Sequence, residues 1–157
     1  MTASLVMAAA MVVLDQLSKH WARAYLIGAG RVTLIEGVFG LVYTENTGAA
    51  FGLFKGQRWF FLILTVFLVA GIVWTMHKKY FPGRLASIAF AFILGGALGN
   101  FVDRAINGFV VDMFEFRFIN FAIFNVADIF LTIGVGLMVI YVIKSGGTEA
   151  LGGKDNP

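Results

Sequence analysis

The chain has 157 residues, of which 59% are hydrophobic and only 13% are charged. Because so few polar side chains cannot cover a soluble globule of this size, we expect the chain to lie in a lipid bilayer. The formal net charge is +3. Lys and Arg are scattered over the ends of apolar stretches, where membrane proteins place them, and nucleic-acid binding is therefore not expected.

The residues that usually hold metals are scarce. The chain has no cysteine, which excludes disulfides, thiolate chemistry and cysteine-ligated metals. Its two histidines, His20 and His77, lie far apart in the sequence. We therefore expect neither a metal nor another cofactor.

Four apolar stretches are each long enough to cross about 30 Å of hydrocarbon as a helix. They run over about residues 3–21, 59–76, 85–102 and 126–143. The first carries its polar residues inside the apolar run and follows no basic segment, so we expect a retained span rather than a cleaved signal. The predicted fold class is a mainly α membrane protein with four transmembrane helices. It forms one domain over residues 1–145, followed by a flexible cytoplasmic tail at 146–157.

Basic residues are more densely spaced, although not more numerous, on one side of the predicted bundle. They are Lys78, Lys79 and Arg84 between the second and third spans, with Lys144 and Lys154 after the fourth. By the positive-inside rule this side is cytoplasmic, and it holds both termini.

Two longer connections then face outward. Residues 23–58 contain two β-branched and aromatic runs around Glu36 and Gly37, which predicts a small extracytoplasmic β hairpin or cradle. Residues 103–125 are predicted to form a periplasm-facing loop.

Ionisable residues inside apolar segments are costly, so each indicates a pairing partner or a site. Asp15 lies one helical turn before Lys19. This spacing allows an ion pair that hides both charges, and it also allows Asp15 to belong to a polar site. The sequence leaves both interpretations open.

The third stretch ends with GGALGNFVDR, which places Asn100 and Arg104 on one helical face with Asp103 beside them. Gly95 and Gly99 have the four-residue spacing of close helix packing in membranes. We favour packing over phosphate binding, because no strand-turn-helix context surrounds these glycines and no Lys follows them.

The fourth stretch opens with FNVAD, so Asn125 and Asp128 share a helical face. Asp128 alone is also consistent with a helix cap. However, the chain leaves the membrane after the third stretch, passes Asp112 and returns at Asp128, so both carboxylates lie near the same outer face. The same topology collects further polar residues there, namely Asp15, Asn46, Asn100, Arg104 and Asn125.

Two carboxyl groups close together in a low-dielectric site do not ionise equally, because one pKa rises and the other falls. A neutral acid then lies beside an ionised base, and the pair titrates as a unit. Such a pair can activate a water for attack on a peptide carbonyl while it donates a hydrogen bond to the carbonyl oxygen. Arg104 is the fixed cation nearby. The sequence does not show whether Arg104 holds Asp103, orients the pair or contacts the substrate.

Five segments in combination resemble the lipoprotein signal peptidases. They are DQLSK (15–19), NTGAAFG (46–52), GGALGNFVDR (95–104), GFVVDMFEF (108–116) and FNVADIFLTIG (124–134). Each segment alone is a weak signal, but their order and spacing cover nearly the whole chain to about Ile143 and make the combination specific.

This resemblance implies an intramembrane aspartic endopeptidase of the bacterial inner membrane with its active site near the outer face. Such an enzyme removes the signal peptide of prolipoproteins just before a Cys that carries diacylglyceryl. The resemblance implies that Asp112 and Asp128 are the catalytic pair. Residues expected to line the site or position the substrate are Asp15, Asn46, Asn100, Arg104 and Asn125, and Asp103 is added as site support. The implied partners are lipid-modified prolipoproteins and membrane lipids, and we expect a monomer.

Two positions depart from the family pattern. Met113, Phe114 and Glu115 follow Asp112 where the family often has Phe and a second Asp, which leaves the role of Glu115 open. Ile129 stands where a Ser is frequent, so no hydroxyl is expected there.

Two other classes of protein compete with the peptidase. A transporter or proton-conducting protein would distribute ionisable residues through the membrane depth, whereas the second and third stretches carry almost none. An assembly protein that oligomerises through Gly95 and Gly99 would leave the outer polar cluster unexplained.

Overall fold

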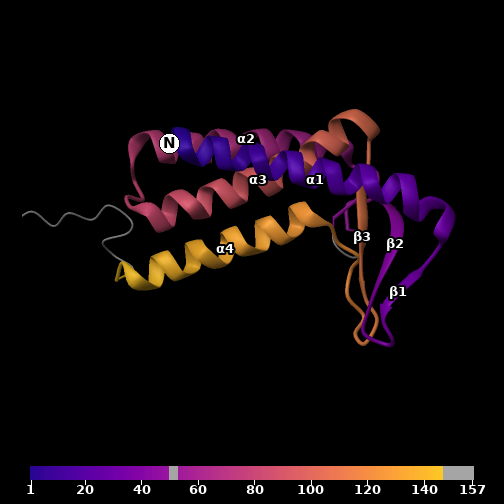
Figure 1. The fold of residues 1–157 in the computed structure, drawn as a ribbon. Coiled ribbons are helices and arrows are strands. Elements are labelled where there is room, and N and C mark those ends of the chain that lie inside the picture. Colours follow the sequence, from indigo (N-terminus) through magenta and orange to yellow (C-terminus); the bar gives the residue numbers. More distant parts are fainter. Residues whose placement is uncertain (50–52, 147–157) are drawn as a thin grey trace, which may run out of the picture.

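The computed structural model describes residues 1–49 and 53–146, which form four long helices and one three-stranded sheet (Figure 1). The helices are α1 (Thr2–Ala29), α2 (Arg58–Lys78), α3 (Arg84–Asn107) and α4 (Val126–Lys144). Each is long and apolar enough to cross a membrane, which confirms the four predicted spans. Two predicted features lie outside the described residues: the last part of the NTGAAFG segment and nearly all of the expected tail.

Helix α3 lies at the centre of the bundle, and its glycines allow the neighbouring helices to approach closely. Gly95 packs against Met11 of α1, and a Cβ placed on Gly99 would lie 2.6 Å from Oδ2 of Asp15. Gly96 faces the backbone of Ala127 in α4. The prediction that Gly95 and Gly99 serve helix packing is therefore confirmed.

The outer surface of the bundle is strongly apolar. In α2, the side chains of Trp59, Phe67 and Trp74 are mostly exposed, and in α4 those of Val135 and Ile143 are too. A continuous surface of this kind suits hydrocarbon rather than water.

The sheet lies across one end of the bundle (Figure 1). It contains β1 (Val32–Ile35), β2 (Phe39–Asn46) and β3 (Val110–Phe116), antiparallel in the order β1-β2-β3. The predicted hairpin is present, and its turn includes Gly37 with φ of 66°. The start of α1, the α2–α3 connection and the end of α4 lie at the opposite end of the bundle.

Strand β3 corrects the prediction of a loop over residues 103–125. Val110–Phe116 pairs along β2, with Asp112 opposite Thr44 and Val110 opposite Asn46. The segment is rich in β-branched and aromatic residues, and the open edge of β2 supplies the backbone partners that a strand needs.

Two helices continue beyond their predicted ends. Helix α1 reaches Ala29 rather than residue 21, because Ala22 and Leu26 are buried against Leu41 and Met113 of the sheet. Helix α3 reaches Asn107 rather than residue 102. Packing against the sheet thus stabilises helix beyond the apolar stretch that hydropathy detects.

Candidate active site

The two aspartates of the predicted pair are joined by one residue, Asn125. Asp112 lies on β3 and Asp128 in the first turn of α4. Asn125 Nδ2 donates to Asp112 Oδ1 at 2.6 Å, and the Asn125 backbone N–H donates to Asp128 Oδ2 at 3.1 Å. Its Oδ1 accepts from the backbone N–H of Asp128 at 3.1 Å. Asn125 and Asp128 thus form a capping box, so the capping interpretation of Asp128 is correct but does not exclude a place in the site.

Two further amides complete the contacts of the pair. Asn46, the last residue of β2, donates from Nδ2 to Asp112 Oδ2 at 2.9 Å. Asn100 on α3 donates from Nδ2 to Asp128 Oδ1 at 2.8 Å. Each carboxylate therefore accepts two N–H hydrogen bonds, and the donors come from three different parts of the fold.

Alternation along β3 decides which side chains reach the site. Asp112 points toward the amides, whereas the next residue, Met113, is buried against the end of α1. The backbone N–H groups of Met113 and Phe114 both donate to the carbonyl of Phe124. This contact fixes the segment that enters α4, so Asp112 and Asp128 are held by one backbone connection as well as by side chains.

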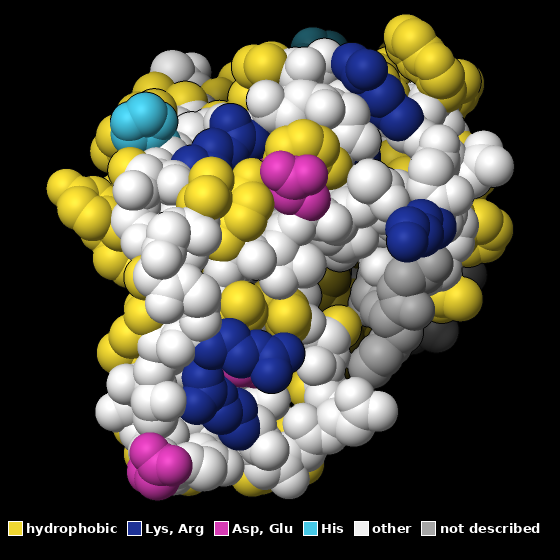
Figure 2. Space-filling model, turned by 90° about the vertical axis from the view of Figure 1, so that its right-hand side faces the viewer, with side chains coloured by type: hydrophobic (Ala, Val, Ile, Leu, Met, Phe, Trp, Pro, Cys, Tyr) yellow, Lys and Arg dark blue, Asp and Glu magenta, His cyan; other side chains and the backbone are white. Residues whose placement is uncertain are grey.

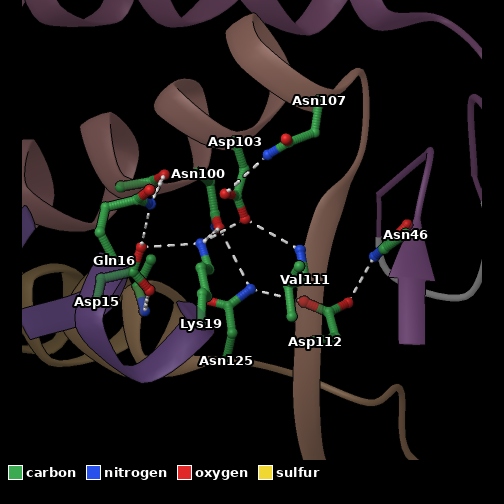
Figure 3. Close-up of polar contacts among 12 residues, drawn as sticks. Asp15, Gln16, Lys19, Asn46, Asn100, Asp103, Asn107, Val111, Asp112 and Asn125 are labelled. Atoms are coloured by element: carbon green, nitrogen blue, oxygen red, sulfur yellow. Dashed lines mark hydrogen bonds and ion pairs between the residues drawn. The ribbon is translucent and has the colours of Figure 1, made fainter. Parts of the chain in front are cut away.

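A buried charge cluster of Asp15, Lys19 and Asp103 lies next to Asn100 and Asn125 (Figure 3). The Lys19 ammonium is 2.8 Å from Asp15 Oδ2 and 3.3 Å from Asp103 Oδ2. Asp15 also accepts from the backbone N–H of Ala127 at 2.9 Å, and Asp103 from that of Val111 at 3.0 Å. Asp15 therefore forms the predicted ion pair and also ties α1 to the start of α4.

Lys19 was predicted only as an ion-pair partner, yet it belongs to this cluster. Its Nζ donates to Asn100 Oδ1 at 2.9 Å, and its side chain is almost completely buried. A basic residue within an apolar stretch was the signal in the sequence. The sequence alone did not show that Lys19 meets Asn100 of another helix.

Arg104 lies at the rim of the site. Its Nη2 donates to the carbonyl of Gly48 at 2.8 Å, and its guanidinium lies 4.4 Å from the centre of the Phe61 ring. Within the described residues, its buried Nε has no hydrogen-bond partner. Asp103, which we considered as its partner, binds Lys19 instead and also lies 3.6 Å from Arg23.

A pocket of about 670 Å³ lies between the sheet and the first half of α4. Its polar lining consists of both aspartates and their neighbours Asn46, Asn100, Arg104 and Asn125. Its apolar lining includes Val110, Phe116, Phe124, Ile129 and Ile133. Asp15 and Asp103 do not line it and lie behind the polar wall.

Burial raises the pKa of Asp112 to about 6, and the negative charge of Asp128 contributes in the same direction. The hydrogen bonds from Asn125 and Asn46 act the other way, because they stabilise the ionised form. Asp112 is thus able to hold a proton close to neutral pH.

Glu115 lies on the opposite face of β3 from Asp112. It pairs with Arg31 at 3.2 Å and with Arg117 at 3.1 Å. Figure 2 shows basic side chains gathered around an acidic one on the outer face of the sheet. Glu115 is thus a partner of these arginines and is separate from the aspartate pair. Ile129, in contrast, contributes an apolar side chain to the pocket.

Within residues 1–49 and 53–146, no three His, Asp or Glu side chains come together in a way that could hold a metal ion. The two aspartates of the pocket are instead hydrogen-bonded to Asn46, Asn100 and Asn125.

Comparison with known proteins identifies the family. A family model for signal peptidase (SPase) II matches residues 7–144. A lipoprotein signal peptidase of Brevibacillus brevis is 44% identical over 139 residues, which cover 88% of this chain and 93% of that protein. One from Lactococcus lactis subsp. lactis is 42% identical over 146 residues, covering 93% and 97%.

A solved structure of a bacterial membrane enzyme matches with a TM-score of 0.86 and 30% sequence identity, over 100% of this chain and 94% of the other. A second solved bacterial membrane enzyme matches with a TM-score of 0.82 and 32% identity, over 92% and 94%. The chain therefore belongs to the signal peptidase II family, and it is a multi-pass membrane peptidase.

Proposed function

We propose that this protein removes the signal peptide from bacterial prolipoproteins and cuts on the N-terminal side of a Cys that carries diacylglyceryl. Asp112 and Asp128 are the catalytic pair in this proposal. The observation that carries it is that one residue, Asn125, donates to both carboxylates at the wall of a largely apolar pocket, from its side chain to Asp112 and from its backbone N–H to Asp128.

The proton balance follows from the surroundings of the two acids. Asp112 is the more deeply buried and has the raised pKa, so it holds the shared proton and acts as the acid. Asp128 takes a proton from a water whose oxygen bonds to the scissile carbonyl carbon. Asp112 donates its proton to the carbonyl oxygen, which gives a tetrahedral diol.

The same two groups complete the reaction. The C–N bond breaks as Asp128 returns its proton to the leaving nitrogen. One hydroxyl proton of the diol passes back to Asp112, and a new carboxylic acid and a free amine remain. The aspartate pair ends in its starting protonation state, so turnover needs no further reagent.

The supporting residues divide into two groups. Asn46, Asn100 and Asn125 orient the carboxylates through the hydrogen bonds described above. Asp15 and Asp103 hold the helices and strand that carry them. Arg104 supports the substrate, since its guanidinium lines the pocket and its Nε has no partner in the described part of the chain.

The shape of the pocket supports a lipid-modified substrate. It combines a polar wall with an apolar one, and it lies beside α4, whose outer surface is apolar. A diacylglyceryl group that stays in the bilayer would thereby bring its Cys and the preceding peptide bond to the aspartate pair. Membrane lipids and lipid-modified prolipoproteins are the proposed partners, and one chain supplies the whole site, in line with a monomer.

The proposed orientation places the sheet and the aspartate pair at the outer face of the bacterial inner membrane. Lys78, Lys79, Arg84 and Lys144 belong to the opposite end of the bundle, which supports a cytoplasmic position for that end and for both termini.

The test is cleavage by the purified full-length protein in detergent, with a diacylglyceryl-modified precursor and the same precursor without lipid. The products are analysed by mass spectrometry. We expect cleavage of the modified precursor immediately before the lipid-bearing Cys and little cleavage of the unmodified one. Equal rates on both precursors would contradict the proposed lipid requirement, and cleavage at another bond would contradict the proposed site.

A further inference from the structure

Lys19 is a fully buried cation that contacts the amide network of the site without lining the pocket. The residue is 1% exposed, and its ammonium contacts Asp15, Asn100 and Asp103. We propose that Lys19 is a positioning residue that fixes the orientation of the amides on both aspartates. This inference rests on the proposed function and deepens it.

The ammonium group of Lys19 has only donors. It can therefore hydrogen-bond only to the amide oxygen of Asn100, and the distance from Lys19 Nζ to Asn100 Oδ1 is 2.9 Å. The NH₂ group of Asn100 must then point the other way, where it donates to Asp128 Oδ1 at 2.8 Å. Lys19 thus determines that Asp128 receives a donor instead of an acceptor.

The same oxygen also fixes the second amide. Asn100 Oδ1 accepts from Asn125 Nδ2 at 3.2 Å, and that nitrogen donates to Asp112 Oδ1 at 2.6 Å. The other end of the Asn125 amide, its Oδ1, accepts from the backbone N–H of Asp128. The side-chain amides of Asn100 and Asn125 therefore each have only one orientation that satisfies all their hydrogen bonds.

A reversed Asn100 would place its amide oxygen against the Asp128 carboxylate and its NH₂ group against the Asn125 NH₂ group. Both contacts are repulsive, and in a buried site each leaves a polar group unsatisfied. Without Lys19, the productive orientation of Asn100 loses one of its two charge-assisted hydrogen bonds and keeps only the one to Asp128.

The alternative is that Lys19 only neutralises Asp15 and Asp103. That alternative predicts a loss of stability after substitution of Lys19, with no specific dependence on Asn100. Positioning predicts instead that the effects of Lys19 and Asn100 on turnover are coupled, because both act through the same amide.

The experiment uses the full-length enzyme in detergent and the diacylglyceryl-modified precursor. Lys19→Met removes the donor and keeps most of the side-chain volume. We expect kcat to fall by about 10- to 100-fold while KM changes less than about threefold, since the pocket wall is unaltered. In an Asn100→Ala background, Lys19→Met is expected to lower kcat by less than about threefold.

A second pair of variants covers the case in which Lys19→Met fails to fold. Lys19→Met with Asp103→Asn removes one cation and one anion together, and the amide introduced at position 103 keeps an oxygen for the backbone N–H of Val111. Relative to Asp103→Asn alone, the double variant is expected to lose about 10-fold or more of kcat. This is the loss that Lys19→Met causes relative to the unaltered enzyme.

Two results would overturn the inference. One is a folded Lys19 variant that keeps Asn100 and has a kcat within about threefold of its reference. The other is losses from Lys19→Met and Asn100→Ala that simply multiply in the double variant. Neither result would affect the proposed function, which fails only if the unaltered enzyme does not cleave or if the aspartate pair is dispensable.

Discussion

At the scale of single residues, Asn125 has two separable roles. Its side chain caps α4 through the Asp128 N–H, and it also donates to Asp112. Asn125→Ala should lower the free energy of unfolding by about 1 kcal/mol from the cap alone, whereas Asn125→Ser keeps a capping oxygen. We expect Ser to restore most of the thermal stability but not kcat, because Ser does not reach Asp112. Thermal melts and cleavage rates of both variants test this, and full recovery of kcat with Ser would be the contrary result.

The raised pKa of Asp112 also predicts how activity depends on pH. Its pKa is raised to about 6, and the proposed acid must be protonated, so kcat/KM should fall as the pH rises through about 6. Asn46 stabilises the ionised form, so Asn46→Leu should move this alkaline limb to higher pH. Measured profiles of both proteins decide the question. A limb that moves to lower pH in the variant would contradict the assignment of Asp112 as the acid.

At the scale of elements, the contact between α1 and α3 requires glycine at position 99. A Cβ there would lie 2.6 Å from Asp15 Oδ2 and 3.2 Å from Ala127 Cβ, whereas nothing lies within 4 Å of one on Gly136. Gly99→Ala should therefore lower the melting temperature and the cleavage rate together. The matched variant Gly136→Ala, also within a helix, should leave both unchanged or slightly raise stability. Equal melting temperatures for the two variants would show that the close approach at Gly99 is unimportant.

The elements also show where sequence reasoning succeeds and where it stops. Hydropathy located all four spans, and the Glu36–Gly37 turn located the hairpin. Strand β3 was missed because its partner, β2, lies about 70 residues earlier, and the local sequence does not identify so distant a partner. The β-branched and aromatic residues of Val110–Phe116 were the available clue.

The polar cluster was predicted from topology and family resemblance, and the structure brings its members together around Asp112 and Asp128. Lys19 was not included, since a residue four positions after an aspartate suggests a local pair. Only the fold shows that its ammonium also meets Asn100.

At the scale of the whole molecule, the sheet and the α2–α3 connection occupy opposite ends of the bundle (Figure 1). The chain contains no cysteine, so single-cysteine variants report the orientation cleanly. Glu36→Cys lies in the hairpin turn, and Tyr80→Cys lies in the α2–α3 connection. In intact cells, a membrane-impermeant maleimide should label the first variant only, and both after the membrane is broken. Labelling of Tyr80→Cys alone in intact cells would reverse the proposed orientation.

The central claim is that Asp112 and Asp128 together perform the cleavage. The most direct measurement is the single-turnover rate of the purified enzyme and of Asp112→Asn and Asp128→Asn on the diacylglyceryl-modified precursor. Asn keeps the size of Asp and one of its two accepting oxygens, so both variants should fold and bind. We expect each to lose about 10³-fold or more of the rate. A variant that is folded and cleaves at the unaltered rate would contradict the account.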